Sequence, residues 1–173
     1  MKNKALFLDR DGIICEALPR GEYLVCWDEF KLMDGVTELF QAAKEKGYKL
    51  LVITNQAQIA KGLMKIETLY EVHEKMRELL HGLIDEIYFC PHKEGDGCEC
   101  RKPKLGLVCR AIEEFDIDPA QSFFVGDSDK DARTGKAMGA KTVFVKNRYN
   151  AEELKRCDPD FVCDTLAEMR KLL

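Results

Sequence analysis

The chain has 173 residues and a net charge of −4, with 46% hydrophobic and 34% charged residues. This length fits one domain, and this composition is typical of a globular protein rather than a disordered one. No apolar run approaches the length of a membrane span, and the negative charge argues against broad nucleic-acid binding. We therefore expect a single domain over residues 1–173, with no membrane or nucleic-acid partner.

The count of 8 cysteines is high for a chain whose first residues do not form a secretory signal. Only four apolar residues separate Lys4 from Asp9. We expect a cytoplasmic, reducing compartment, in which disulfide bonds are disfavoured. Metal binding is then the first explanation for clustered thiols.

Apolar strands alternate with amphipathic helices along the chain. In chain order, the patterns predict a strand at 4–8, a helix at 35–46, a strand at 49–54, a helix at 66–81, a strand at 85–89, a helix at 105–115, a strand at 122–125, a helix at 129–138, a strand at 141–145 and a last helix opened by a capping box at 165–168. This alternation predicts an α/β protein with a Rossmann-like, doubly wound parallel sheet.

Several residues with useful chemistry fall at or just beyond the predicted strand ends. They are Asp9, Thr54, Cys90 and Asp127. Ligands of such sheets bind at the carboxyl ends of the strands. Two segments, 14–32 and 90–104, leave these ends without fitting the alternation, so we expect both to lie over the same edge of the sheet.

The helical periodicity also assigns individual side chains to faces. It places Leu79 on the apolar face of the 66–81 helix and packs Cys109 beside Val108 and Ile112. We expect His73 to be solvated on or near a polar helix face.

Two acids alternate directly after the first strand, in Asp9-Arg10-Asp11-Gly12. Side chains so placed can converge on one ligand, and Gly12 lets the chain turn away. The two carboxylates could hold a divalent cation, or one could act as a nucleophile while the other moves protons. A plain polar turn is the alternative, because Asp and Gly are common turn residues.

A second apolar strand ends in the acids of Gly126-Asp127-Ser128-Asp129-Lys130-Asp131. Three carboxylates in five positions repel one another unless they are solvated or bound to a metal. We interpret Asp127 as a metal-ligand candidate and Asp129 as a residue that favours a helix N-terminus. The role of Asp131 stays open.

Phosphate chemistry is indicated by two further segments. Thr54-Asn55-Gln56 offers a hydroxyl, amides and backbone N–H groups that suit a phosphate. Arg101-Lys102-Pro103-Lys104 supplies cations that could neutralise a phosphoryl group. Each segment by itself is also consistent with an ordinary solvated loop.

The strongest local pattern is Cys90-Pro91-His92, five residues, then Cys98-Glu99-Cys100. Three thiolates and one imidazole match a closed structural Zn²⁺ site. Free thiols with a surface histidine are the alternative. A closed site has no open coordination position for a substrate or water. We therefore expect the metal to have a structural role and to staple the 90–104 loop, holding its two ends together.

Taken together, the chain resembles the haloacid dehalogenase superfamily over nearly its whole length. The four motifs of that superfamily are matched in order by Asp9-Arg10-Asp11-Gly12, Thr54-Asn55-Gln56, Arg101-Lys102-Pro103 and Gly126-Asp127. The zinc loop is similar to that of the heptose-bisphosphate phosphatases and the histidinol-phosphate phosphatases. The resemblance implies a phosphatase fold without a large cap domain, because neither 14–32 nor 57–65 is long enough to form one.

The resemblance also implies roles for the acids. Asp9 would attack phosphorus and form an aspartyl-phosphate, and Asp11 would protonate the leaving oxygen and then activate water. Mg²⁺ would be held by Asp9, by the backbone carbonyl of Asp11 and by Asp127.

The remaining motif residues would act on the phosphate. Thr54 and Asn55 would bind the phosphoryl oxygens, Lys102 would stabilise the nucleophile and the transferring charge, and Arg101 would help to hold the substrate. Such positioning and charge neutralisation are what phosphoryl transfer requires. We therefore expect a small phosphorylated substrate, a monomer, one Mg²⁺ and one Zn²⁺.

Different parts of the sequence favour different subfamilies. The run from Thr54 to Gly62 looks like the heptose enzymes, which typically carry Gly-Ile-Ala-Arg-Gly where this chain has Gln58-Ile59-Ala60-Lys61-Gly62. The five-residue gap in the zinc loop is more like the histidinol-phosphate branch. Ser128 also replaces a lysine that is frequent in the heptose enzymes.

We therefore expect a D-glycero-D-manno-heptose 1,7-bisphosphate 7-phosphatase, with histidinol-phosphate hydrolysis as the alternative and the anomer open. In the 14–32 flap, Arg20 and Tyr23 are candidate substrate neighbours, and packing within the flap is the expected role of Trp27. A zinc-loop interaction module on an inactive phosphatase fold is the non-enzymatic alternative. The intact acids and Lys102 argue against it, and the acidic charge argues against a DNA-end phosphatase.

Overall fold

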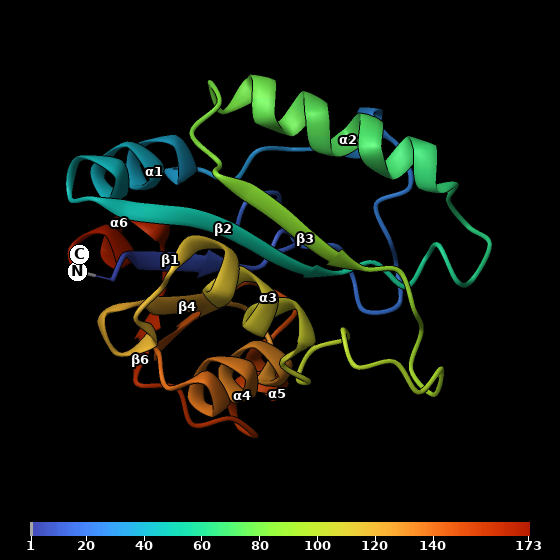
Figure 1. Ribbon diagram of the computed structural model, residues 1–173. Helices are drawn as coiled ribbons and strands as arrows, with labels where there is room; N and C mark the ends of the chain where they lie inside the picture. The colour runs from blue at the N-terminus through green and yellow to red at the C-terminus, as the bar shows by residue number, and fades with distance from the viewer. Residues whose placement is uncertain (1) are drawn as a thin grey trace.

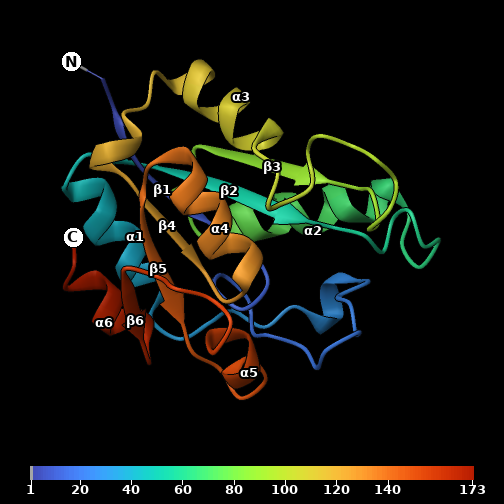
Figure 2. The ribbon, with the colours of Figure 1, turned by 90° about the horizontal axis from the view of Figure 1, so that it is seen from below.

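The computed structural model describes residues 2–173, which form one parallel sheet with helices on both faces. The strands are β1 (Lys4–Leu8), β2 (Tyr48–Asn55), β3 (Glu86–Cys90), β4 (Phe123–Gly126), β5 (Lys141–Val145) and β6 (Phe161–Cys163). Their order across the sheet is β3-β2-β1-β4-β5-β6, and every pairing is parallel. The predicted doubly wound α/β fold is confirmed (Figures 1 and 2).

Six α-helices lie within the described residues, five between successive strands and one after the last strand. They are α1 (Val36–Glu45), α2 (Ile66–Leu79), α3 (Gly106–Phe115), α4 (Asp129–Met138), α5 (Ala151–Leu154) and α6 (Leu166–Arg170). Short 3₁₀ turns lie at Trp27–Glu29 and Pro119–Gln121. No helix in residues 2–173 combines the length and the hydrophobicity that crossing a membrane would need.

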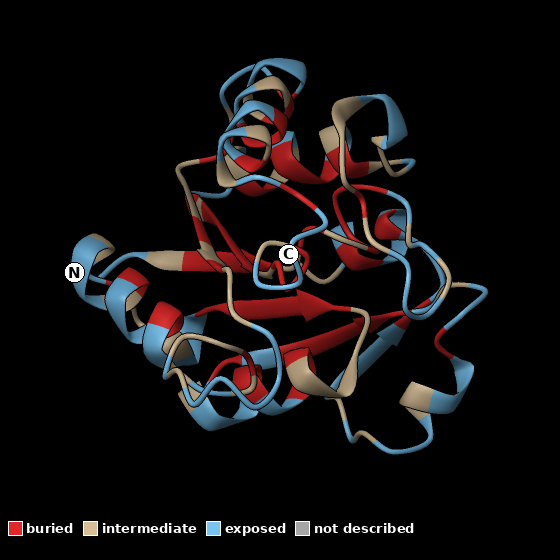
Figure 3. Ribbon diagram, turned by 90° about the vertical axis from the view of Figure 1, so that its right-hand side faces the viewer, coloured by how far each residue is buried: buried red, intermediate tan, exposed pale blue. Residues whose placement is uncertain are grey.

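Strand side chains alternate between two cores, one on each face of the sheet. Leu6 and Leu8 of β1 face the core that contains buried residues of α1 and α6, together with Met76 of α2. Ala5 and Phe7 face the opposite core, which contains the buried residues of α3. Because both faces are covered, the strands read as continuous apolar runs. Figure 3 shows the buried strands enclosed between helices whose outer surfaces are exposed.

Three expectations about side-chain faces were wrong. Leu79 is 43% exposed, whereas Leu80 is fully buried, because Leu80 continues the line of Leu69 and Met76 at helical spacing. Cys109 is exposed on α3, on the side away from the core residues Val108 and Ala111.

His73 is the third. It lies on the apolar face of α2 and is only 4% exposed. Its position four residues after Leu69 and three before Met76 places it among the core residues of that helix.

The two long segments lie at the carboxyl end of the sheet, to the right in Figure 1. Residues 14–32 leave the end of β1, and residues 91–104 leave the end of β3. Two short elements were not predicted, β6 and α5, because three or four residues carry little periodicity of their own. Pairing with β5 defines β6 as a strand.

Candidate active site

The carboxyl ends of β1, β2 and β4 open onto a cavity of about 350 Å³. Asp9 follows β1 directly, Asn55 ends β2 and Asp127 follows β4. Parallel pairing of β1 with β2 and β4 brings these three positions to one edge, as the sequence predicted. Their side chains line the cavity together with other predicted site residues, namely Asp11, Arg101 and Lys102.

Three carboxylates form an acidic cluster in this cavity. Oxygens of Asp9, Asp127 and Asp131 all lie within 4.8 Å of one another. Burial, together with the charges of the neighbouring carboxylates, raises the pKa of Asp9 to about 7 and the pKa of Asp127 well above its usual value. Burial and mutual repulsion of this kind fit a site that holds a divalent cation, which favours the ionised form of Asp9 and Asp127.

Two glycines allow this close approach of the acids. Gly12 has a φ of +84°, and a Cβ there would overlap the Asp127 carboxylate. A Cβ on Gly126 would overlap the Asp131 side chain. Any larger residue at either place would displace a carboxylate from the cluster.

Lys102 is the cation that faces the acidic cluster. Its Nζ lies 2.6 Å from Asp131 Oδ1 and 3.0 Å from Asp9 Oδ2, and its side chain is only 2% exposed. Burial alone would lower the pKa of Lys102, but the charges of Asp131 and Asp9 outweigh it and raise the pKa to about 12. Lys102 is therefore charged beside Asp9, as transfer of a phosphoryl group requires.

Asp131, whose role the sequence left open, has two tasks in the structure. One oxygen accepts from Lys102, and the other accepts from the hydroxyl of Ser128 at 2.6 Å. Asp131 and Ser128 form a capping box at the start of α4. This capping box ties the acidic cluster to the N-terminus of α4.

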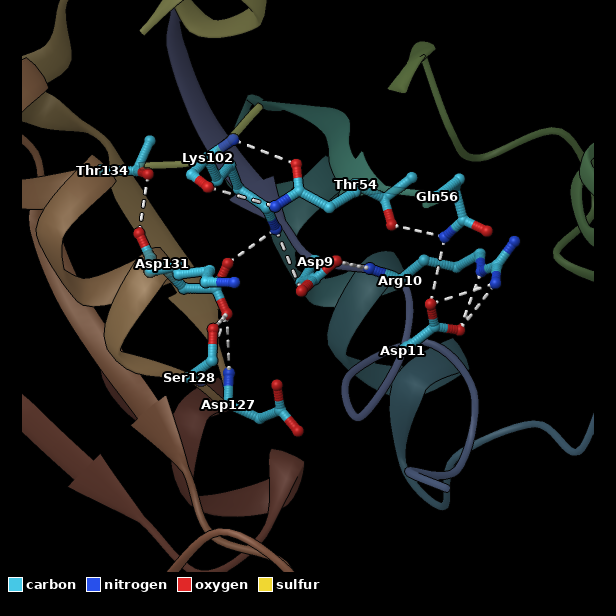
Figure 4. A network of polar contacts seen from close by, with 12 residues as sticks. Asp9, Arg10, Asp11, Thr54, Gln56, Lys102, Asp127, Ser128, Asp131 and Thr134 are labelled. Carbon is cyan, nitrogen blue, oxygen red and sulfur yellow. Dashed lines mark hydrogen bonds and ion pairs between the residues drawn. The ribbon is translucent and has the colours of Figure 1, made fainter. Parts of the chain in front are cut away.

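Asp11 lies on the opposite side of Asp9 from Asp127 and Asp131, as Figure 4 shows. Arg10 Nη2 donates to both of its oxygens, at 2.8 and 3.0 Å, and Arg10 Nε donates at 2.9 Å. Burial opposes ionisation here, but the Arg10 charge outweighs it and lowers the pKa of Asp11. Arg10 itself is fully buried.

Asn55 and Arg101 support the cation side of the cavity. Asn55 accepts from the backbone N–H of Lys102 at 3.0 Å and donates to its carbonyl at 3.2 Å. Arg101 Nη1 donates to the carbonyl of His92 at 3.1 Å. The segment that carries Lys102 is thereby tied both to the end of β2 and to the Cys/His loop.

Thr54 and Gln56 are fully buried and do not line the cavity. Gln56 Nε2 donates to Asp11 Oδ2 at 3.0 Å and to Thr54 Oγ1 at 2.8 Å, and its backbone N–H donates to Cys90. The structure therefore joins Gln56 to Asp11. Phosphate binding by Thr54 stays a prediction.

The flap covers one side of the cavity. Arg20 and Tyr23 line it, as anticipated. Trp27 instead stacks on Phe30 with ring centroids 4.7 Å apart, so it packs within the flap. Tyr23 also accepts a 2.6 Å hydrogen bond from Lys61, which links the flap to the loop after β2.

The four predicted zinc ligands come together in one cluster. Ligand atoms of Cys90, His92, Cys98 and Cys100 lie within 4.8 Å of one another. The Cys90 sulfur is 3.7 Å from that of Cys98 and 3.0 Å from that of Cys100, and His92 Nδ1 is 3.3 Å from the Cys100 sulfur. Tetrahedral Zn²⁺ with bonds of about 2.3 Å to sulfur separates two sulfur ligands by about 3.8 Å. The donor set fits Zn²⁺, and the distance between the Cys90 and Cys98 sulfurs agrees with such a site.

Sequence reasoning missed the residues that hold Asp127. Asn147 Nδ2 donates to Asp127 Oδ2 at 2.8 Å, and Asn150 Nδ2 donates to the Asp127 carbonyl at 3.0 Å. Both lie in the loop after β5, about 20 residues further along the chain, and no motif marks them.

Comparison with protein families matches residues 1–139 to the haloacid dehalogenase-like hydrolases. The chain belongs to this family. Its parallel sheet agrees with the fold that the resemblance implied, and the enzyme is a phosphatase that acts on a small phosphorylated substrate.

Similar proteins share almost the whole length of this phosphatase. A D-glycero-beta-D-manno-heptose-1,7-bisphosphate 7-phosphatase of Pasteurella multocida is 39% identical over 98% of this chain and 96% of its own. A D-glycero-alpha-D-manno-heptose-1,7-bisphosphate 7-phosphatase of Campylobacter jejuni is 38% identical over 88% and 87%. The crystal structure of a D,D-heptose 1,7-bisphosphate phosphatase from B. bronchiseptica, complexed with magnesium and phosphate, has a TM-score of 0.89 at 28% identity, covering 98% and 97%.

Proposed function

We propose that this phosphatase removes the 7-phosphate of D-glycero-D-manno-heptose 1,7-bisphosphate. The observation that carries the chemistry is the contact of Lys102 with Asp9, at 3.0 Å, beside an acidic cluster of which Asp9 and Asp127 line the cavity. The relatives named for this reaction, similar over nearly the full chain, support the substrate. The two anomers named among them leave the anomer to be measured.

In the first step, a carboxylate oxygen of Asp9 attacks phosphorus and the bond from phosphorus to the sugar oxygen breaks. Although the Arg10 charge lowers the pKa of Asp11, this residue takes a proton from water in each turnover and gives it to the departing sugar oxygen in the next. In the second step, Asp11 takes a proton from water as the water oxygen attacks phosphorus. The bond between phosphorus and the Asp9 oxygen breaks, which frees inorganic phosphate and restores the Asp9 carboxylate. Lys102 neutralises charge at Asp9 throughout.

In this proposal Asn55, Arg101 and Lys102 bind the phosphoryl group. Thr54, near the end of β2, is a fourth residue proposed to bind it. Gln56 is not included, because both hydrogens of its amide are already bound within the protein. Asp9, Asp127 and the Asp11 carbonyl would hold Mg²⁺, and Asp131 belongs to the same cluster. The cation would supply charge neutralisation and alignment of the phosphate.

The rest of the chain completes a single-domain monomer. Residues 14–32 act as the substrate-facing flap, and residues 90–104 act as a loop stapled by Zn²⁺ on Cys90, His92, Cys98 and Cys100. Arg101 donates a hydrogen bond to the carbonyl of His92, one of the metal ligands. The metal would therefore also hold the segment that carries Arg101 and Lys102.

Phosphate release from a substrate panel tests this function. We expect one anomer of the heptose bisphosphate to give the highest kcat/KM, with heptose 1-phosphate as the product seen by ³¹P NMR. Histidinol phosphate is the alternative substrate, favoured by the five residues between His92 and Cys98. A preference for histidinol phosphate, or release of the 1-phosphate, would reject the proposed substrate.

A further inference from the structure

A chain of buried hydrogen bonds joins the flap to Asp11. Gln58 Nε2 donates to the carbonyl of Leu24 in the flap at 3.2 Å and to Gln56 Oε1 at 2.5 Å. Gln56 Nε2 then donates to Asp11 Oδ2 at 3.0 Å. The two amides are 0% and 1% exposed, so water does not compete for these bonds.

The direction of these bonds is determined by their ends. A carbonyl oxygen at Leu24 and a carboxylate at Asp11 both require a donor. Each amide NH₂ has two hydrogens. Gln56 donates to Asp11 and Thr54 Oγ1, and Gln58 donates to Leu24 and Gln56, with the Met64 sulfur 3.9 Å from its nitrogen. Reversing either amide would place an oxygen against an oxygen, so the network has a single consistent arrangement.

Both ends of the chain lie at the substrate cavity. Leu24 lines the cavity, as do Glu22 and Tyr23 before it and Asp11 at the other end of the hydrogen-bond chain. The Leu24 side chain is 4% exposed and packs in a small core with Met64 and Leu69. The backbone at Leu24 is thus held in place, and its carbonyl presents a rigid acceptor to Gln58.

We propose that Gln58 is a positioning residue that couples the flap to the orientation of the Asp11 carboxylate through Gln56. A substrate whose leaving group contacts the flap then also determines where Asp11 stands when it delivers its proton. This inference rests on the proposed function only in taking Asp11 as the proton donor. Gln58 contacts neither phosphate nor sugar in this scheme.

Leaving groups of different acidity give the test. The leaving group of heptose bisphosphate is a sugar alkoxide, which needs the proton from Asp11. The leaving group of p-nitrophenyl phosphate is a stable phenolate, which departs with little help from an acid. In Gln58→Met, which keeps the length of the side chain without its hydrogen bonds, we expect kcat/KM for the heptose bisphosphate to fall about tenfold, part of the usual gain from general acid catalysis. For p-nitrophenyl phosphate we expect less than about a twofold change in kcat/KM, which reports the first step and not the later attack of water that Asp11 assists for both substrates.

A double-mutant cycle separates coupling from packing. If Gln56 and Gln58 act as one chain, Gln56→Met lowers the same ratio, that of kcat/KM for heptose bisphosphate to kcat/KM for p-nitrophenyl phosphate, and the double variant is no worse than the more severe single variant. Independent effects would multiply instead, and would reject the proposal. Gln58→Glu is a second variant, since its carboxylate faces the Leu24 and Gln56 oxygens and must break the same bonds.

Lys61→Met is the matched control, because it removes another contact to the flap, the hydrogen bond to Tyr23, and leaves the amide chain intact. We expect its ratio of the two kcat/KM values to stay within about twofold of the parent, as for a contact outside proton transfer. Equal losses of kcat/KM on both substrates in Gln58→Met would overturn the proposal. Turnover retained in Asp9→Asn would instead reject the proposed function, so the two failures are distinct.

Discussion

Lys102 Nζ and Asp131 Oδ1 lie 2.6 Å apart, and both side chains are only 2% exposed. Burying two charges is costly unless each is paired and its remaining hydrogen-bonding atoms are satisfied. Asp131 meets this condition by capping α4 with its other oxygen. The pair therefore joins the start of a helix to the lysine that faces Asp9.

Removing the Asp131 charge tests how much this ion pair contributes to the stability of the fold. We expect Asp131→Ala to lower the free energy of unfolding by about 3–5 kcal/mol, because Lys102 is left buried without its closest partner. Urea unfolding followed by circular dichroism measures it. Asp129→Ala is the control, since its contact with Arg133 is 3.6 Å long and partly solvated. A loss in Asp129→Ala equal to that in Asp131→Ala would contradict the assignment.

Asp9→Asn tests the nucleophile. The amide cannot form an aspartyl-phosphate, so we expect turnover of heptose bisphosphate to fall to background while zinc content and melting temperature stay near those of the parent. Single-turnover phosphate release, with metal analysis of the same sample, is the measurement. Substantial remaining turnover would exclude Asp9 as the nucleophile.

The zinc loop is tested by removing one ligand. We expect about one Zn²⁺ per chain, as for a single four-ligand site, and none in Cys98→Ser. Because Arg101 is bonded to the His92 carbonyl, we also expect the variant to lose activity and to expose the 90–104 loop to protease. Cys109→Ser is the matched control, since Cys109 is exposed and outside the cluster. Zinc retained in full by Cys98→Ser would contradict the site.

His73 predicts a pH dependence of stability. Burial, together with the Arg10 charge, lowers the pKa of His73 to about 3, from 6.5 in an exposed histidine. Between these values the unfolded chain binds a proton that the folded chain refuses, so stability falls as pH drops from about 6.5 toward 3. We expect His73→Phe to flatten this slope by up to one proton, about 1.4 kcal/mol per pH unit.

Urea unfolding at a series of pH values from 7 to 4.5 measures the slope. His81→Asn serves as the control, because His81 is exposed and asparagine tolerates its positive φ of 53°. The slope in His81→Asn should match that of the parent. If His73→Phe gives the parental slope as well, His73 is not the group that refuses the proton.

Asn147 is expected to orient Asp127. Its amide donates to Asp127 Oδ2 at 2.8 Å and so restricts the rotation of this carboxylate. We expect Asn147→Ala to weaken Mg²⁺ binding by about tenfold, as loss of outer-shell partners commonly does. Isothermal titration with Mg²⁺ measures this, with the exposed Lys146→Ala as the control. Unchanged Mg²⁺ affinity in Asn147→Ala would reject the role.

The acids and the zinc ligands could be predicted from the sequence because their information is local. Asp9 and Asp127 each follow an apolar strand, and parallel strands bring their carboxyl ends to one edge. Cys90, His92 and Cys98 lie on one short loop, so proximity along the chain already implies proximity in space. The doubly wound fold followed from the same alternation of strands and helices.

The partners of these residues were decided only by tertiary structure. His73 lies on α2 yet contacts Arg10 at 3.5 Å, and Asn147 reaches Asp127 from a different strand end. Gln58 meets Leu24 across 34 positions of sequence. In water, a polar side chain can exchange freely between partners. Burial makes each unpaired donor or acceptor costly in free energy, so the partner of a polar side chain is fixed only once packing has removed water from it. The composition and the strand ends therefore predicted the kind of site, while the folded packing determined which residues orient it.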